Sequence, residues 1–143
     1  MTTIAEPLVI HRWTTLSFAS TLFLQPVLDL LLGEIPDLIQ TKSELRLGLH
    51  EALVNAAKHG NKLDPSKLIL VRYSAVEGQF WWVIADQGCG FQPHYTSVIQ
   101  ANCPPCVEAE CGRGLYILHQ IFDQVYWNAQ GTELSLYKRL TAS

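Results

Sequence analysis

The most informative segment of this sequence is Glu51-Ala52-Leu53-Val54-Asn55-Ala56-Ala57-Lys58-His59-Gly60. Its residue types favour a helix, in which positions four apart lie on the same face. Glu51, Asn55 and His59 therefore form a polar stripe. At about 100° per residue, an apolar stripe lies about 200° away around the helix, and it consists of Leu45, Leu49 and Leu53. We expect one face of this helix to pack in the core and the other to be free for chemistry.

Further along the chain, three glycine-containing segments add to this pattern. Asp86-Gln87-Gly88-Cys89-Gly90-Phe91 follows an apolar run directly, Gly112-Arg113-Gly114-Leu115 opens a helix-like stretch, and Gly131-Thr132 begins a terminal strand. Each motif alone is common in turns and loops. In this order, however, a carboxylate at a strand end, glycines that let backbone approach a ligand, and a glycine-rich helix N-terminus suit a nucleotide with its phosphates.

These motifs resemble the N box, the two glycine boxes and the closing Gly-Thr of the GHKL (Bergerat-fold) ATPases. This superfamily contains histidine-kinase catalytic domains, type II topoisomerases and heat-shock chaperone ATPases. Within it, the small size of the chain, the His59-Gly60 pair and the segment Phe122-Asp123-Gln124-Val125 most resemble bacterial anti-sigma factor serine/threonine kinases. The resemblance covers nearly the whole chain.

The resemblance implies a role for each matching residue. Glu51 would be the catalytic general base, and Asn55, whose carboxamide oxygen is a hard ligand, would bind Mg²⁺. Asp86 would accept a hydrogen bond from the adenine amino group, and Thr132 would lie beside the adenine. His59 is either a contact to a phosphate or to the lid, or a capping or packing residue. The full set expected to bind ATP is Asn55, Asp86, Gly88, Gly90, Gly112, Arg113, Gly114, Leu115 and Thr132.

The family's function also implies partners. Such proteins hold a sigma factor inactive and phosphorylate a serine or threonine on a small anti-anti-sigma antagonist of the STAS type, so that transcription is regulated by partner switching. Homodimers are common among them. We therefore expect an anti-sigma factor that is an ATP- and Mg²⁺-dependent protein serine/threonine kinase. The alternative is a non-catalytic nucleotide-binding regulatory module of the same fold; a detached histidine-kinase catalytic domain is disfavoured because no helix with a substrate histidine is evident.

One position departs from the family pattern. In well-studied kinases of the family an arginine precedes the second glycine box and is thought to meet the terminal phosphate, but Glu110 stands at about this place. A carboxylate repels phosphate unless Mg²⁺ or Arg113 compensates. Glu110 thus favours the non-catalytic alternative, whereas Glu51 and Asn55 favour turnover.

Composition is consistent with a single cytoplasmic domain. The 143 residues are enough for one hydrophobic core, so residues 1–143 are expected to form one domain. The net charge of -3 disfavours direct nucleic-acid binding and leaves a protein as the expected partner. The most apolar segment, residues 16–32, is interrupted by Gln25, Pro26 and Asp29. It is also shorter than the roughly 20 residues of a membrane span, so we expect no membrane association.

The four cysteines lie close together in the sequence. Cys103 and Cys106 have the spacing of redox or zinc sites, and Cys89 and Cys111 flank them. The interpretation we favour is reduced thiols in a variable loop, because disulfides are rare in the cytosol. A redox or zinc switch that controls access to the site is the alternative.

The periodicity of the sequence predicts an α/β (α+β) two-layer sandwich, a mixed sheet covered on one face by about three helices. The resemblance narrows this class to the Bergerat fold. Helices are expected around 20–33, from Thr41 or Ser43 to His59, and from Gly112 to about Asp123. Strands are expected at 8–13, 68–73, 79–85, 125–128 and 132–140, with a hairpin turn at Glu77-Gly78. Residues 91–111 are long for a passive connection and are predicted to form a lid.

Overall fold

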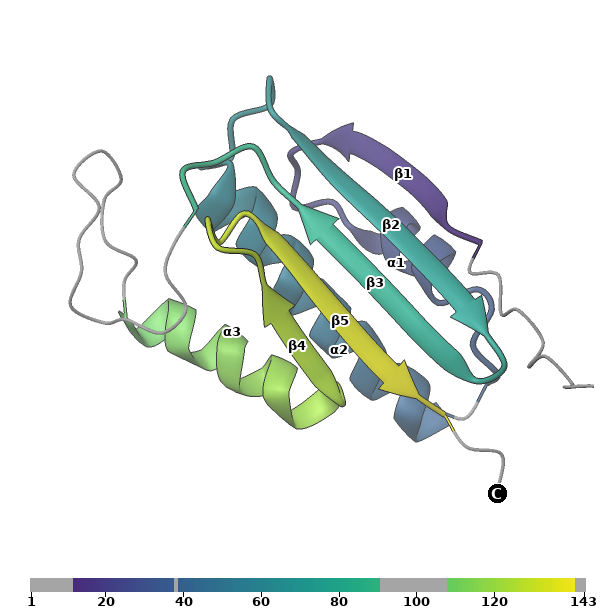
Figure 1. The fold of residues 1–143 in the computed structure, drawn as a ribbon. Coiled ribbons are helices and arrows are strands. Elements are labelled where there is room, and N and C mark those ends of the chain that lie inside the picture. The colour runs from purple at the N-terminus through teal and green to yellow at the C-terminus, as the bar shows by residue number, and fades with distance from the viewer. Residues whose placement is uncertain (1–11, 38, 91–107, 141–143) are drawn as a thin grey trace, which may run out of the picture.

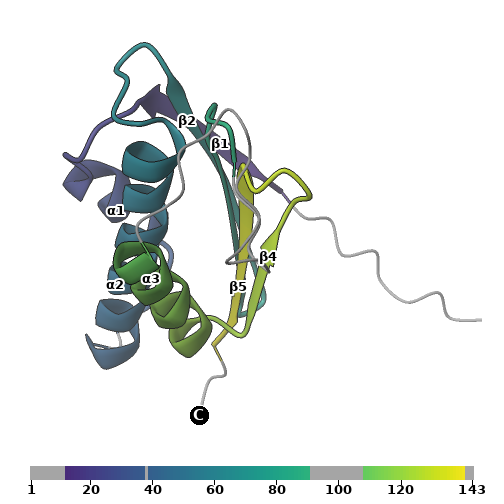
Figure 2. The same ribbon diagram turned by 90° about the vertical axis from the view of Figure 1, so that its left-hand side faces the viewer.

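A computed structural model of the chain describes residues 12–37, 39–90 and 108–140, with only the backbone of residues 39 and 108–114. Five strands form one sheet, and the helices lie against one of its faces (Figures 1 and 2). The strands are β1 (Thr14–Ala19), β2 (Leu68–Val76), β3 (Gln79–Ala85), β4 (Gln124–Trp127) and β5 (Glu133–Arg139). The helical segments are α1 (Gln25–Leu31), α2 (Ile39–Val54), η1 (Asn55–Gly60) and α3 (Glu108–Ile121).

The predicted two-layer class is confirmed, but the sheet is not mixed. Its strand order is β1-β2-β3-β5-β4, and all four pairings among these strands are antiparallel. Two of the pairings are hairpins, β2 with β3 and β4 with β5. Hairpin partners are necessarily antiparallel because a short turn reverses the chain. The expectation of a mixed sheet was therefore wrong.

The apolar stripes predicted for the helices form the core. Leu45, Leu49 and Leu53 on α2 are fully buried, and Val27, Leu28 and Leu31 of α1 are buried as well, whereas Leu30 of α1 is exposed. Trp82 of β3 connects the sheet to α1, because its indole N–H donates to the Leu31 carbonyl oxygen at 3.3 Å. The two tryptophans of β3 face opposite sides of the sheet, as expected from their alternation, because Trp82 joins the core while Trp81 packs on Tyr137. The leucine stripe of α2 belongs to the same core cluster as Trp82, so this face of the helix packs toward the sheet.

Element boundaries differ most near the N-terminus. The first strand begins at Thr14, after the predicted 8–13 segment, of which residues 8–11 lie outside the described residues. Threonine and phenylalanine favour strands, and Leu16 and Phe18 of β1 pack against the core. The first helix is consequently shorter than expected, beginning at Gln25 with Pro26 in its first turn, where proline is tolerated. Within the described residues, no helix is long and apolar enough to cross a membrane.

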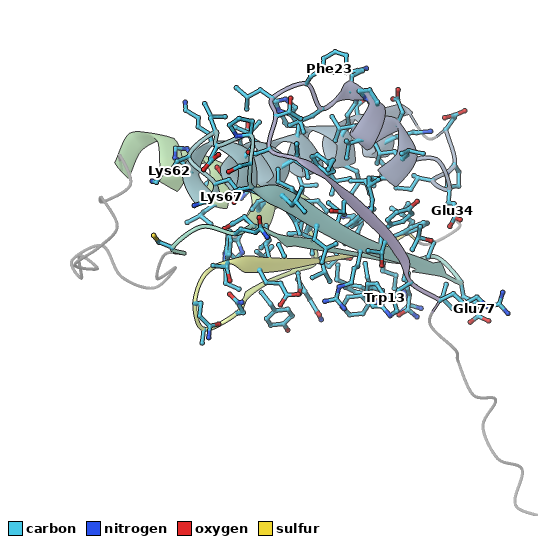
Figure 3. All side chains as sticks on the ribbon, turned by 90° about the horizontal axis from the view of Figure 1, so that it is seen from above. Trp13, Phe23, Glu34, Lys62, Lys67 and Glu77 are labelled. Carbon is cyan, nitrogen blue, oxygen red and sulfur yellow. The ribbon has the colours of Figure 1, made fainter. Side chains whose placement is uncertain are left out.

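The hairpin of β2 and β3 forms as predicted, except that β2 continues to Val76, three residues beyond the predicted 68–73. β3 spans Gln79–Ala85 as predicted. Glu77 and Gly78 connect it to β2 with φ angles of 49° and 78°. Two successive positive φ angles give the twist that a tight hairpin needs. This turn lies at one end of the molecule, whereas the connection from η1 to β2, with Lys62 and Lys67, lies at the other (Figure 3).

Candidate nucleotide-binding site

The helix that carries the first motif ends in a wider turn. After Val54 the chain continues as the π-helical segment η1, in which the Asn61 N–H donates to the Ala56 carbonyl oxygen at 2.8 Å, five residues back. Such turns are rare and often occur at functional sites. The extra residue in the turn changes which side chains align, so His59 does not simply continue the polar stripe. The helix ends at Gly60, close to the predicted end.

Gly60, the last residue of η1, lies against Asp86, which follows β3. A Cβ atom built on Gly60 would overlap the Asp86 carboxyl group, and one built on Gly88 would overlap the Gly60 carbonyl oxygen. The Gly88 N–H donates to Asp86 Oδ1 at 2.8 Å. Only glycine permits both approaches. The structure thus brings two predicted site residues, Asp86 and Gly88, against Gly60, which was not among the predicted site residues and directly follows the predicted end of the helix at His59.

Asp86 and Thr132 occupy neighbouring positions across the sheet. The Asp86 N–H donates to the Thr132 carbonyl oxygen at 2.9 Å, one residue beyond the last pair of the β3–β5 ladder. Residues directly opposite each other in an antiparallel pair point to the same face. Ile84 and Leu134, two residues further into β3 and β5 respectively, are buried in the core. The side chains of Asp86 and Thr132 therefore lie on the helix side of the sheet, where the core ends.

The Asp86 carboxyl group is in an unusual electrostatic environment. Burial raises its pKa above the ordinary 3.8, and the Gly88 N–H and the charge of Lys67 oppose this shift without cancelling it. A carboxylate that is partly removed from water gains more from a hydrogen-bond donor on a ligand than an exposed one does. This arrangement fits the predicted contact with an adenine amino group.

Asn61 fixes the segment that contains Asp86. Its side chain is fully buried, accepts the Gln87 N–H at 2.8 Å and donates to the Leu68 carbonyl oxygen at 3.0 Å. The Gln87 side chain in turn accepts the Leu68 N–H at 2.7 Å. Side chains thus replace the backbone ladder where β2 and β3 separate. This role was not predictable from the sequence, because asparagine is common in turns and the partner Gln87 is 26 residues away along the chain.

A second junction joins the glycine segment after β3 to the turn before β5. Gly90 has a φ of 80°, and a Cβ atom built on it would overlap the Gln130 carbonyl oxygen and lie 3.2 Å from the Thr132 methyl group. The turn itself is organised by Asn128, whose side chain bonds Thr132 at both its N–H and its hydroxyl. Gly90 and Thr132, both predicted site residues, are therefore in proximity. Asn128 was missed, although its position four residues before Thr132 could have suggested a turn-forming amide.

The predicted catalytic and metal-binding residues lie on the helix that leads to this junction. Asn55 is the first residue of η1, within about 8 Å of Gly60 along the axis, and Glu51 lies about 6 Å further back, at about 1.5 Å rise per residue. Both side chains are half-buried. Within the described part of the chain, no hydrogen bond or ion pair occupies either side chain. A carboxamide oxygen that is not otherwise engaged suits Mg²⁺, which accepts few protein ligands, so Asn55 fits the expected ion.

The second glycine box is placed differently from the expectation. Helix α3 begins at Glu108, four residues before Gly112, so the predicted helix start was wrong. Alanine and glutamate are good helix formers, and acidic residues are favourable in a first turn, which explains the extension through Glu108-Ala109-Glu110. Gly112, Arg113 and Gly114 consequently stand inside the helix, beyond the residues whose N–H groups are free at a helix start. Leu115 follows them in the same helix and is half-buried.

The predicted lid, residues 91–111, lies almost entirely outside the described residues, as do Cys103 and Cys106. Of Cys111 and Arg113, only the backbone is described. Cys89 is disulfide-bonded, so the interpretation of reduced thiols was wrong for this residue. For the other cysteines, the redox and zinc hypotheses remain predictions.

Comparison with known proteins identifies the fold family. Residues 36–138 match the model of the histidine kinase-like ATPase domain. The chain belongs to this family. The matched range includes the whole of the two junctions described above, and the predicted resemblance to the GHKL superfamily is confirmed. This ATPase domain is also similar to a serine-protein kinase, RsbW of Bacillus licheniformis, with 30% identity over 86 residues, 57% of this chain and 54% of the relative. The chain thus spans about half the length of the curated relative that it matches.

Proposed function

We propose that this ATPase domain is an ATP- and Mg²⁺-dependent protein serine/threonine kinase that acts as a cytoplasmic anti-sigma factor. It would hold a sigma factor inactive and phosphorylate an anti-anti-sigma antagonist of the STAS type. The observation that carries the proposal is the double junction at the end of the sheet, where Gly60, Asp86 and Gly88 meet and Gly90 approaches Thr132. Similarity to a serine-protein kinase supports the choice of reaction within the family.

Each residue has a defined part in the proposed reaction. Asp86 would accept a hydrogen bond from the adenine amino group, and Asn55 would hold Mg²⁺, which would supply positive charge to neutralise the phosphates. Glu51 accepts the proton of the substrate hydroxyl as its oxygen bonds to the γ-phosphorus, and the bond from this phosphorus to the β-phosphate oxygen breaks to release ADP. Phosphoryl transfer depends mainly on positioning and charge neutralisation. Gly112, Arg113 and Gly114 would approach the phosphates.

The second candidate function is a non-catalytic nucleotide-binding module of the same fold. Glu110 favours it, because a negative charge stands where the family's kinases have an arginine. The enclosure of Gly112 and Gly114 within α3 adds support, because their N–H groups are not free for phosphate. In that case the nucleotide would stabilise a partner-binding surface without transfer. The single-domain organisation and homodimerisation remain predictions in either case.

Phosphorylation of a STAS-type antagonist distinguishes the two functions. The chain, the antagonist, radiolabelled ATP and Mg²⁺ are incubated together, and label on the antagonist is measured with wild type, Glu51→Gln and Glu44→Gln. Glu44 is a matched control, because it is an exposed glutamate on the same helix. The kinase proposal predicts label with wild type and Glu44→Gln and its loss with Glu51→Gln, although this variant still binds ATP. Binding of ATP without any label on the antagonist would support the non-catalytic module.

A further inference from the structure

The side chain of Asn128 makes three hydrogen bonds within the turn that joins β4 to β5. Its Oδ1 accepts the N–H groups of Thr132 and Glu133 at 2.9 and 3.1 Å, and its Nδ2 donates to the Thr132 hydroxyl at 3.1 Å. The turn is closed further by the Asn128 N–H, which donates to the Glu133 carbonyl oxygen at 2.9 Å. The amide is therefore held in one place by the backbone N–H groups of Thr132 and Glu133 and by the Thr132 hydroxyl.

The two backbone N–H groups also determine the orientation of the Asn128 side-chain amide, that is, the positions of its oxygen and its nitrogen. Backbone N–H groups can only donate, so the oxygen of the amide must face them and its nitrogen must face the Thr132 hydroxyl. An amide nitrogen only donates, so the hydroxyl oxygen accepts this bond. The hydroxyl hydrogen of Thr132 cannot point to Asn128 and stays available for another acceptor.

Thr132 and Asp86 are neighbours on the same face of the sheet. We infer that Asn128 is a positioning residue that keeps the Thr132 hydroxyl hydrogen free for the ligand, so that the site reads a purine through one donor and one acceptor. The inference rests on the proposed nucleotide site. Asp86 accepts from an exocyclic amino group, and Thr132 donates to the ring nitrogen beside it. Adenine presents a 6-amino donor and an N1 acceptor, which match these two groups. Hypoxanthine presents the opposite pattern, a 6-oxo acceptor and an N1–H donor.

Asn128→Asp tests the inference with little change in shape. The carboxylate still accepts the two backbone N–H groups, but it has no hydrogen to donate and instead accepts the hydroxyl hydrogen of Thr132. Thr132 then presents only lone pairs to the ligand. Affinities for ATP and for inosine triphosphate are measured by calorimetry with Mg²⁺. The added charge acts equally on two ligands with the same triphosphate, so it cancels in the ratio of the two affinities.

The expected result is a preference of wild type for ATP that falls at least tenfold in Asn128→Asp. In a Thr132→Val background, the same substitution should leave the ratio unchanged, because the hydroxyl through which it acts is absent. A purely structural role for Asn128 would lower thermal stability and both affinities together without changing the ratio. An unchanged ratio in Asn128→Asp, or an equal change in the Thr132→Val background, would overturn the inference.

A second measurement does not depend on the folding of any Asn128 variant. Wild type is titrated with 1-deaza-ATP, in which a C–H group replaces the N1 acceptor. The inference predicts binding at least tenfold weaker than that of ATP, and equal binding of the two ligands would contradict it. If wild type binds ATP but the ratio of affinities or the 1-deaza-ATP titration gives the contrary result, the proposed nucleotide site is retained and the proposed role of Asn128 is rejected. If wild type binds no purine triphosphate, the proposed function fails as well.

Discussion

Replacing Gly60 by alanine is the most informative change that the structure suggests. The added Cβ atom would overlap the Asp86 carboxyl group and lie 2.7 Å from Asp86 Oδ1. Real Cβ contacts are not this short, so the carboxyl group must rotate away and lose its bond with the Gly88 N–H. The backbone of η1 accepts alanine without strain, because Gly60 is not among the glycines with positive φ. The substitution therefore moves a predicted ligand-binding group without removing any atom of it.

The size of the effect follows from the hydrogen bond to the adenine amino group, which the displaced Asp86 carboxyl group can no longer accept. A hydrogen bond to a charged group contributes about 1.5–3 kcal/mol, and about 1.4 kcal/mol corresponds to a tenfold change in affinity. Gly60→Ala should thus weaken ATP binding by about ten- to one-hundredfold. Alanine is favoured over glycine in a helix by about 0.5–1 kcal/mol, which offsets part of the cost of displacing Asp86. The melting temperature should change little.

Two other glycines provide matched controls. At Gly33 an added Cβ atom would meet only backbone oxygens at 3.5 Å, so Gly33→Ala should alter neither binding nor stability. At Gly48 it would lie 2.6 Å from a ring carbon of Phe122, which is buried in the core. Gly48→Ala should therefore lower the melting temperature. ATP affinity and thermal melts are measured for all three variants.

A Gly60→Ala variant that binds ATP as tightly as wild type would contradict this expectation. In that case the contact between η1 and Asp86 would be a packing feature, and Asp86 would not hold the base. Weakened binding accompanied by an equally large loss of stability in Gly60→Ala would also contradict the argument, because it would show general damage to the fold.

Three further substitutions have defined outcomes. Asp86→Asn should melt higher than wild type near pH 7 while losing ATP binding. Burial raises the carboxyl pKa in the folded chain, so the folded chain holds the proton to a higher pH and the free energy of unfolding of wild type falls as the pH rises through this pKa. Asn61→Ala leaves two backbone groups without partners and should lower the free energy of unfolding by about 2 kcal/mol in urea titrations. Gly90→Ala places a side chain at a φ of 80° against Gln130 and should weaken ATP binding in calorimetry.

Each of these outcomes has a clear opposite. The stability advantage of Asp86→Asn should disappear toward about pH 3, where the carboxyl group is protonated in both states; an advantage independent of pH would have another cause. A stability of Asn61→Ala equal to that of wild type would mean that water replaces the buried amide. For Gly90→Ala, unchanged binding would show that the segment after β3 adjusts freely to the added side chain.

The sequence predicted best those features that depend on local pattern. The leucine stripe of α2, the limits of β3 and the turn at Glu77-Gly78 follow from periodicity and turn chemistry within a few residues. The start of α3 did not follow, because the helix-forming residues before Gly112 outweighed the glycine signal. Likewise, the first strand within the described residues is Thr14–Ala19, directly after the predicted segment 8–13, since strand propensity extends across both segments.

The candidate site was predicted in its main residues and missed in its supporting ones. Asp86, Gly88, Gly90 and Thr132 belong to motifs that are recognisable in the sequence, and the structure brings them to two adjoining junctions. Asn61 and Asn128 act through partners such as Leu68 and Thr132 that only the fold identifies. The π-helical turn at Asn55 was not predictable either, because it replaces an α-helical turn of the same residues. Roles that depend on tertiary contacts lie beyond local pattern.

Whether this chain binds a nucleotide is decided by a calorimetric titration with ATP, with and without Mg²⁺, of wild type and Asn55→Ala. We expect binding by wild type that strengthens with Mg²⁺, and loss of this Mg²⁺ dependence in Asn55→Ala with thermal stability retained. The opposite result, no ATP binding by a folded wild-type chain, would mean that the two junctions do not form a nucleotide site.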